Sequence, residues 1–181
     1  MTQRLVNIND LVTLIKEIKS IPKENDIRFI LPDEVFKTKI GNCVDIALAI
    51  RSFCLKHNID YSIARVGFNY NEKSSQHHVI CCLFIKNKWI IIQKSFAKEI
   101  GYVFQGNNDL NETIKNFALI YLPYLIKLFN NVKESYYEIV DKTEDIKFNI
   151  LNEINNIKLL NKQQFIYNMF KNITKHYINI N

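Results

Sequence analysis

Glycine and proline are scarce in this chain of 181 residues, which contains only four and three copies of them. That scarcity excludes collagen-like and flexible-linker sequences, because both are rich in these residues. Hydrophobic residues make up 48% of the chain and charged residues 23%, a balance that excludes an intrinsically disordered protein. A chain of this length suits one domain with a small helical addition.

Long apolar stretches are also missing. The apolar runs, such as Phe117 to Leu122, are far shorter than the roughly 18–20 residues that span a bilayer. The first ten residues contain no apolar segment of the signal-peptide kind. Four cysteines are too few for a disulfide scaffold in a chain of this size. We therefore expect a reduced, cytoplasmic protein without a membrane partner.

Positive charge is present but not concentrated. The net charge is +6, yet only four of the 24 cationic residues are arginine, and no run of five or six like charges occurs. Isoleucine, asparagine and lysine contribute 29, 23 and 20 residues, a skew typical of an AT-rich bacterial, phage or viral genome. This skew explains the charge without a polyanionic partner, so we do not expect nucleic-acid binding.

The spacing of apolar residues predicts an amphipathic helix at about Asn9–Ser20 and a second, largely buried helix that begins at Cys43. Asn42 is a good N-cap for the second helix, and Asp45 lies three residues on, where its carboxylate can bond back to the cap. Three strands are then expected, the last two joined as a hairpin: Tyr61–Asn69, His78–Ile85 and Trp89–Phe96.

The pattern turns helical from about Asp109 onward. A helix over Asp109–Asn131 contains Pro123, which predicts a kink or break. Two apolar stripes follow at helical spacing: Ile146, Ile150, Ile154 and Ile157, then Phe165, Met169, Ile173 and Tyr177. We expect an α+β fold with a catalytic core at 1–108, built on a mainly antiparallel sheet. Helices at 109–181 would pack on that core to form one compact unit.

Cys43 is the first candidate for chemistry. Unpaired N–H groups at a helix N-terminus favour a thiolate, and the same groups can donate to an oxyanion formed during acyl transfer. The alternative is that Cys43 is simply a small buried residue at a helix start.

Two histidines and a glutamine complete a candidate set. His77 and His78 begin one strand, and Gln93 ends the next, so a nucleophile, a base and an orienting group occur in order along the chain. Because side chains alternate along a strand, only one of the two histidines can point toward Cys43.

The segment around these residues resembles the core of the transglutaminase-like superfamily. The resemblance rests on the run Gly41-Asn42-Cys43-Val44-Asp45-Ile46-Ala47, on a helix that ends in Lys56-His57-Asn58-Ile59-Asp60, and on the strand that follows. His78 lies eleven residues before Trp89, and the position of the family's aspartate falls on Gln93, four residues after Trp89. The resemblance covers about a third of the chain, roughly Ile40–Phe96.

This resemblance implies a papain-like α+β fold and a triad in which Cys43 is the nucleophile and His78 the base. His77 stays open as the alternative base. The family includes peptidases, amidases, glutamyl acyltransferases and inactive binding versions. Gln93 departs from the family's aspartate: its neutral carbonyl oxygen can orient the ring of His78 but stabilises an imidazolium less. The replacement of aspartate by Gln93 predicts a slower or a lost reaction. We assign Asp45, which can bond back to the helix cap, a structural role.

The sequence therefore predicts a cysteine-dependent hydrolase or acyltransferase that acts on amide bonds of a protein or peptide. The alternative is a catalytically degenerate domain of the same kind that binds proteins. No cofactor or metal is expected, because the cysteines form no CxxC pair and the glycines match no nucleotide-binding fingerprint. The remaining cysteines are predicted to lie in the core: Cys54, Cys81 and Cys82. Substrate, oligomeric state and the choice between hydrolysis and transfer stay open.

Overall fold

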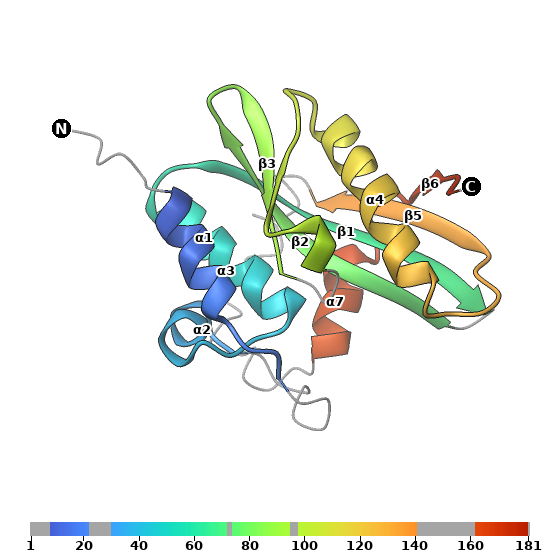
Figure 1. The fold of residues 1–181 in the computed structure, drawn as a ribbon, viewed down its shortest axis with the longest axis horizontal. Coiled ribbons are helices and arrows are strands. Elements are labelled where there is room, and N and C mark those ends of the chain that lie inside the picture. The colour runs from blue at the N-terminus through green and yellow to red at the C-terminus, as the bar shows by residue number, and fades with distance from the viewer. Residues whose placement is uncertain (1–7, 22–29, 72–73, 95–97, 141–161, 181) are drawn as a thin grey trace.

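The computed structural model describes residues 8–21, 30–71, 74–94, 98–140 and 162–180. In this part of the chain, helices pack on a six-stranded antiparallel sheet with the strand order β4-β3-β2-β1-β5-β6 (Figure 1). The strands are β1 (Asp60–Asn71), β2 (Ser74–Ile85), β3 (Lys88–Ile92), β4 (Val103–Gln105), β5 (Glu134–Val140) and β6 (His176–Ile178). The helices are α1 (Ile8–Glu17), α2 (Pro32–Thr38), α3 (Cys43–Lys56), the short 3-10 helix η2 (Lys98–Ile100), α4 (Leu110–Ile126) and α7 (Lys162–Phe170).

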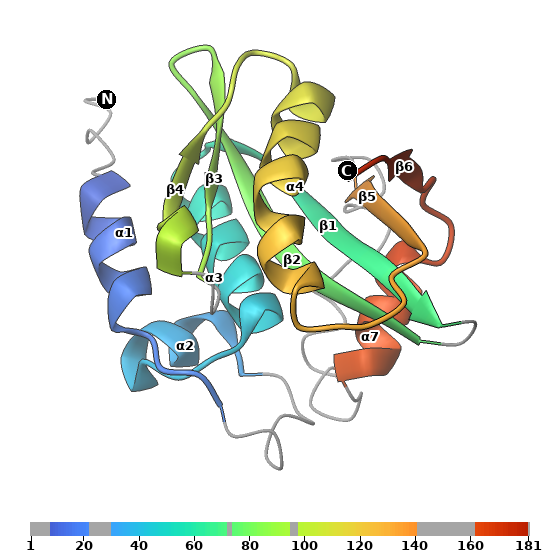
Figure 2. The ribbon, with the colours of Figure 1, turned by 45° about the vertical axis from the view of Figure 1, so that its right-hand side comes forward.

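The sheet separates two hydrophobic clusters. Alternate residues of β2 point to opposite sides: Val79 and Cys81 pack with α1, α3 and α7, whereas Ile80 and Cys82 pack with α4. Figure 2 shows the same arrangement, with α4 in front of the strands and α3 behind them. A strand that is buried on both faces has apolar residues at successive positions, which explains why the sequences of β2 and β3 are almost continuously apolar.

The start of α3 is held by the capping box that the sequence predicts. The side-chain oxygen of Asn42 accepts hydrogen bonds from the backbone N–H groups of Val44 and Asp45, at 2.9 and 3.1 Å. In return, the carboxylate of Asp45 accepts the N–H of Asn42 at 3.0 Å. This cap satisfies N–H groups that have no partner inside the helix, so α3 begins at Cys43.

The α+β class, α1 and the first three strands are confirmed, with shifts of a few residues at their ends. The sequence did not predict α2, nor the strands β4, β5 and β6. The region expected to be wholly helical therefore supplies two strands, β5 and β6, which extend the sheet beyond β1.

Of the kink or break predicted at Pro123, the break is wrong, because α4 continues through the proline to Ile126. Phe117, Tyr121 and Leu125 lie on both sides of the proline and pack in one apolar cluster, and their burial offsets the lost backbone hydrogen bond. Of the two predicted stripes, Ile146–Ile157 lies outside the described residues. In the other, Phe165 and Met169 lie in α7 but Tyr177 lies in β6, so the stripe is not one helix.

None of the described helices is long and apolar enough to cross a membrane.

Candidate active site

Cys43 is the first residue of α3, a half-buried cysteine that forms no disulfide. Its position exposes the thiol to the partial positive charge of the helix N-terminus. The cap already uses two of the first-turn N–H groups, those of Val44 and Asp45. These two groups are therefore not available as oxyanion donors while Asn42 holds them.

Asp45 is fully buried, and its two carboxylate oxygens accept different backbone groups. One accepts the N–H of Asn42 and the other the N–H of Ile30, at 3.0 and 3.1 Å. The carboxylate therefore ties the chain before α2 to the start of α3, which is a structural role.

His78 and Gln93 form a hydrogen-bonded pair. His78 Nε2 lies 2.9 Å from Gln93 Oε1, and the two residues are only 4% and 3% exposed. The amide nitrogen of Gln93 donates to the carbonyl oxygen of Gly101, and its backbone N–H donates to Tyr102 O at 3.0 Å. The oxygen of the Gln93 side chain is thus held by His78 on β2, and its nitrogen by Gly101 in the turn after η2.

This arrangement assigns the tautomer of His78. Because the amide nitrogen of Gln93 donates to Gly101, its oxygen must face the imidazole and accept a hydrogen from it. The neutral ring therefore carries its hydrogen on Nε2. The lone pair on Nδ1 is left as the basic position.

Burial keeps this ring uncharged. Desolvation lowers the pKa of His78 from 6.5 to about 4, and the hydrogen bond to Gln93 opposes that shift only in part. The ring of Tyr121, from α4, stacks on the imidazole with 4.8 Å between centroids and 24° between planes. His78 is therefore neutral at pH 7, and the side of the sheet that it faces is the side covered by α4.

His77 takes the other side of the sheet, as strand alternation requires. Its face is that of Val79 and Cys81, which pack with α3. Among the side-chain atoms of the described residues, His77 Nδ1 is the one buried nitrogen or oxygen without a hydrogen-bond partner. Burial, and then the charges of Arg65 and His78, lower the pKa of His77 to about 4.

The three predicted catalytic residues thus fall into two groups. The structure brings His78 and Gln93 together on the α4 side of the sheet. Cys43 packs against the cluster on the α3 side, which is also the side that His77 faces.

The other cysteines lie in the core, as the sequence predicts. Cys54, Cys81 and Cys82 are fully buried, and burial is the largest cause that raises the pKa of Cys81 and of Cys82. The thiols of Cys81 and Cys82 therefore stay protonated and unreactive. Cys43 differs from them by its half-buried position at a helix start.

Sequence reasoning missed Tyr121 and Gly101, the two residues that hold the pair from outside β2 and β3. Tyr121 lies within the helix predicted over Asp109–Asn131, but the sequence carried no signal for which face of the sheet that helix covers. Among the described residues, no group of three or more His, Cys, Asp and Glu side chains could hold a metal ion.

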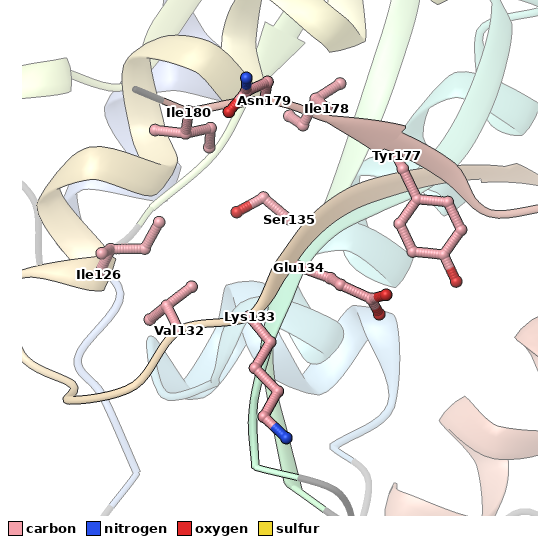
Figure 3. Close-up of a pocket in the computed structure, with 9 residues that line it drawn as sticks. All are labelled: Ile126, Val132, Lys133, Glu134, Ser135, Tyr177, Ile178, Asn179 and Ile180. Atoms are coloured by element: carbon pink, nitrogen blue, oxygen red, sulfur yellow. The ribbon is translucent and has the colours of Figure 1, made fainter.

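A separate hollow of about 610 Å³ lies where the end of α4 meets β5 and β6 (Figure 3). Ile126, Val132, Ile178 and Ile180 line it with aliphatic groups, and the hydroxyl of Ser135 points into it. The lining of this hollow includes none of the three predicted catalytic residues.

Comparison with known proteins finds no family model and no curated protein that matches the chain.

Proposed function

We propose that this protein is a cysteine-dependent hydrolase or acyltransferase that acts on an amide bond of a protein or peptide, on a transglutaminase-like core. Cys43 is the nucleophile, His78 the base and Gln93 the group that orients His78. The papain-like arrangement of helix and hairpin belongs to the same proposal.

One observation carries this proposal: the 2.9 Å hydrogen bond between His78 Nε2 and Gln93 Oε1. The two residues expected to be base and orienter are in contact, and the tautomer that this contact selects leaves Nδ1 basic. A polar neighbour that fixes the tautomer is one requirement for a general base, and reach to the proton is the other.

The chemistry follows from these roles. The proposed reaction requires the Cys43 thiol to come within reach of His78 Nδ1, although the two residues pack on opposite sides of the sheet in the structure. His78 Nδ1 would then take the thiol proton, and the sulfur would attack the carbonyl carbon to form a C–S bond while negative charge moves to the oxygen. The oxyanion re-forms the carbonyl, the C–N bond breaks, and the imidazolium returns its proton to the leaving amine. Water or a second amine then attacks the thioester, His78 takes its proton, and Cys43 leaves as a thiolate that His78 reprotonates.

Alkylation by iodoacetamide tests the nucleophile directly. Cys43 should react faster at pH 6–7 than a model thiol, and His78→Ala should abolish that advantage. Mass spectrometry of peptides identifies the modified cysteine, and the buried Cys54, Cys81 and Cys82 serve as internal controls. His77→Ala is the matched control for the base, since it removes the neighbouring imidazole from the opposite face.

The proposal fails if Cys43 labels no faster than the model thiol and if His78→Ala leaves the rate unchanged. A dependence on His77 instead would reassign the base to the histidine on the α3 side. Release of ammonia, compared with incorporation of a dansylated primary amine into casein, separates hydrolysis from transfer.

A catalytically inactive domain that binds proteins is the second candidate, and specific observations favour it. His78 is covered by Tyr121 and almost fully buried, and Cys43 packs with the cluster on the other side of the sheet. The outer face of α4 also exposes large apolar side chains: Leu119, Ile120 and Tyr124, with Leu128 just beyond the helix. Exposed apolar groups gathered on one face are typical of protein-binding surfaces.

The two candidates differ in what they predict for Cys43→Ala. An enzyme loses labelling and turnover with this variant, whereas a binding module keeps its partner. For Ile120→Lys we expect the opposite. An enzyme keeps labelling and turnover, because the residues around His78 stay in place, whereas a binding module loses its partner, because the exposed face of α4 is changed.

A further inference from the structure

A second hollow, of about 400 Å³, lies where the starts of β1 and β3 and the end of β2 meet the start of α4. Three cross-strand neighbours form one wall: Asp60 on β1 pairs with Phe84 on β2, which pairs with Trp89 on β3. Residues paired directly across antiparallel strands point to the same face of the sheet, here the face that α4 covers. Asn108 and Leu110 add to the lining from the start of α4.

The aromatic part of this wall is firmly held. The rings of Phe84 and Trp89 contact each other, with 5.0 Å between centroids and 50° between planes. The backbone N–H of Trp89 donates to Asn107 O at 2.7 Å, and the carbonyl of Trp89 accepts the N–H of Gly106 at 2.9 Å. Both rings are only half-buried, so part of each stays accessible to a ligand. The face of an aromatic ring carries partial negative charge and attracts cations.

The polar groups of the hollow offer hydrogen-bond acceptors. Asp60 is exposed, and an ionised carboxylate accepts hydrogen bonds but cannot donate them. Asp60 takes part in another interaction as well, and its two oxygens together accept several donors. The hydroxyl of Ser62 donates its hydrogen to Val140 O at 2.9 Å, so its oxygen is left as an acceptor. Among the described residues that line the hollow, Asp60 alone is charged, and its charge is negative in a chain whose net charge is +6.

We propose that this hollow binds the guanidinium group of an arginine side chain from a protein or peptide partner. A guanidinium is flat and positively charged, so it can stack on the ring of Trp89 and pair with the carboxylate of Asp60. All of its N–H groups donate, which matches the acceptors that Asp60 and Ser62 present. The site is independent of the proposed reaction, because neither Cys43 nor His78 lines the hollow.

The single tryptophan of the chain gives a direct readout. Trp89 contributes the one indole N–H signal in a proton–nitrogen NMR spectrum, and the probe is N-acetyl-arginine amide. This probe should shift the indole signal in a saturable way. N-acetyl-citrulline amide has nearly the same shape but no charge, and it should not shift the signal.

Asp60→Asn tests the carboxylate without disturbing the core, since Asp60 is exposed. It should weaken binding of the arginine derivative by about fivefold, the effect of an ion pair at an open site. Asp33→Asn is the matched control, because it removes the same charge from an exposed position of α2 outside the lining. Trp89→Leu should abolish binding, which the backbone signals of Asn108 and Leu110 then report.

The proposal is overturned if the arginine derivative causes no saturable shift, or if the citrulline derivative binds equally well. An affinity that Asp60→Asn leaves unchanged also overturns it. N-acetyl-lysine amide that binds as tightly would reject the guanidinium, and free arginine that binds more tightly than the capped derivative would reject a side chain as its source. Cys43→Ala should bind the arginine derivative as the parent protein does, so failure of the proposed function would leave this result unchanged.

Discussion

Gln93 stands where the transglutaminase-like pattern has an aspartate, and its two ends explain why a glutamine suits this site. Its oxygen accepts from His78, and its nitrogen donates to the carbonyl of Gly101. A carboxylate can accept but cannot donate. The carbonyl of Gly101 therefore favours an amide over a carboxylate at this position.

Gln93→Glu should destabilise the protein at pH 7 by about 1–3 kcal/mol, because a buried carboxylate would face the carbonyl of Gly101 with no hydrogen to donate. Urea unfolding measures the change. The difference in stability from the parent protein should shrink at low pH, where the protonated acid can donate again. Gln105→Glu, the same substitution at an exposed position of β4, is the control and should change little.

The burial of His78 predicts how stability depends on pH. Its pKa is about 4 in the folded protein and 6.5 in an exposed chain, so between these values the unfolded state binds more protons. The contribution of neutral His78 to the free energy of unfolding is therefore fully present above pH 6.5 and is lost as the pH falls toward 4. The loss amounts to roughly 3 kcal/mol, since each unit of pKa corresponds to about 1.4 kcal/mol.

Thermal unfolding between pH 8 and pH 4.5 tests this expectation by comparing the parent protein with His78→Gln, which cannot be protonated. The variant should show a flatter dependence on pH. His176→Gln, at an exposed histidine of β6, should retain the parent slope. Equal slopes in all three proteins would contradict the burial argument.

Among the elements, α3 depends most clearly on its first residues. Asn42 accepts two N–H groups, and Asp45 returns a bond to it. The cap fixes where the helix begins and hence places Cys43 at its first position. A shifted start would move the thiol relative to the helix end.

Asn42→Ala should cost about 0.5–2 kcal/mol of unfolding free energy, the usual cost of a lost N-cap. Asn42→Asp keeps an accepting oxygen at the same place and should retain most of the stability. Urea unfolding of the two variants at pH 7 gives the comparison. A loss as large in the aspartate variant as in the alanine variant would mean that the cap is not the stabilising contact.

Pro123 shows how packing overrides a local rule. A proline inside a helix costs about 3 kcal/mol or more by propensity alone. The apolar side chains on both sides of it nevertheless keep α4 in one piece against the sheet. The local signal thus allowed a break that does not occur, because it takes no account of how the side chains around the proline are buried against the sheet.

At the scale of the whole molecule, the sheet is built from two parts of the chain. β1, β2 and β3 are consecutive, whereas β5 joins the far edge of β1 from about 70 residues away. A buried ion pair connects the two parts: the Nε of Arg65 on β1 donates to the carboxylate of Glu138 on β5. The ring of Phe170 from α7 covers the guanidinium at 4.3 Å.

Glu138→Gln should lower stability by about 3–5 kcal/mol, because it leaves the largely buried charge of Arg65 without its counter-ion. The double variant Arg65→Met with Glu138→Gln should recover much of that loss, since it removes the unpaired charge as well. Urea unfolding of both proteins measures the difference. Glu134→Gln, on an exposed residue of the same strand, is the control.

The sequence by itself determined the features that depend on neighbours in the chain. The capping residues predict the start of α3, and the β-branched and aromatic runs predict the hairpin of β2 and β3. Their spacing also identified His78 and Gln93 as a candidate pair, which the structure joins through one hydrogen bond. In each case the deciding contacts join residues that are no more than about fifteen positions apart in the sequence.

Only the tertiary structure decided which helix covers which histidine. Strand alternation requires His77 and His78 to face opposite sides, but it does not say which side belongs to α3 and which to α4. That choice depends on how separate apolar surfaces are buried together, a property of contacts between distant segments. For the same reason the stacked ring of Tyr121, the carbonyl of Gly101 and the strand β5 became visible only in the folded protein.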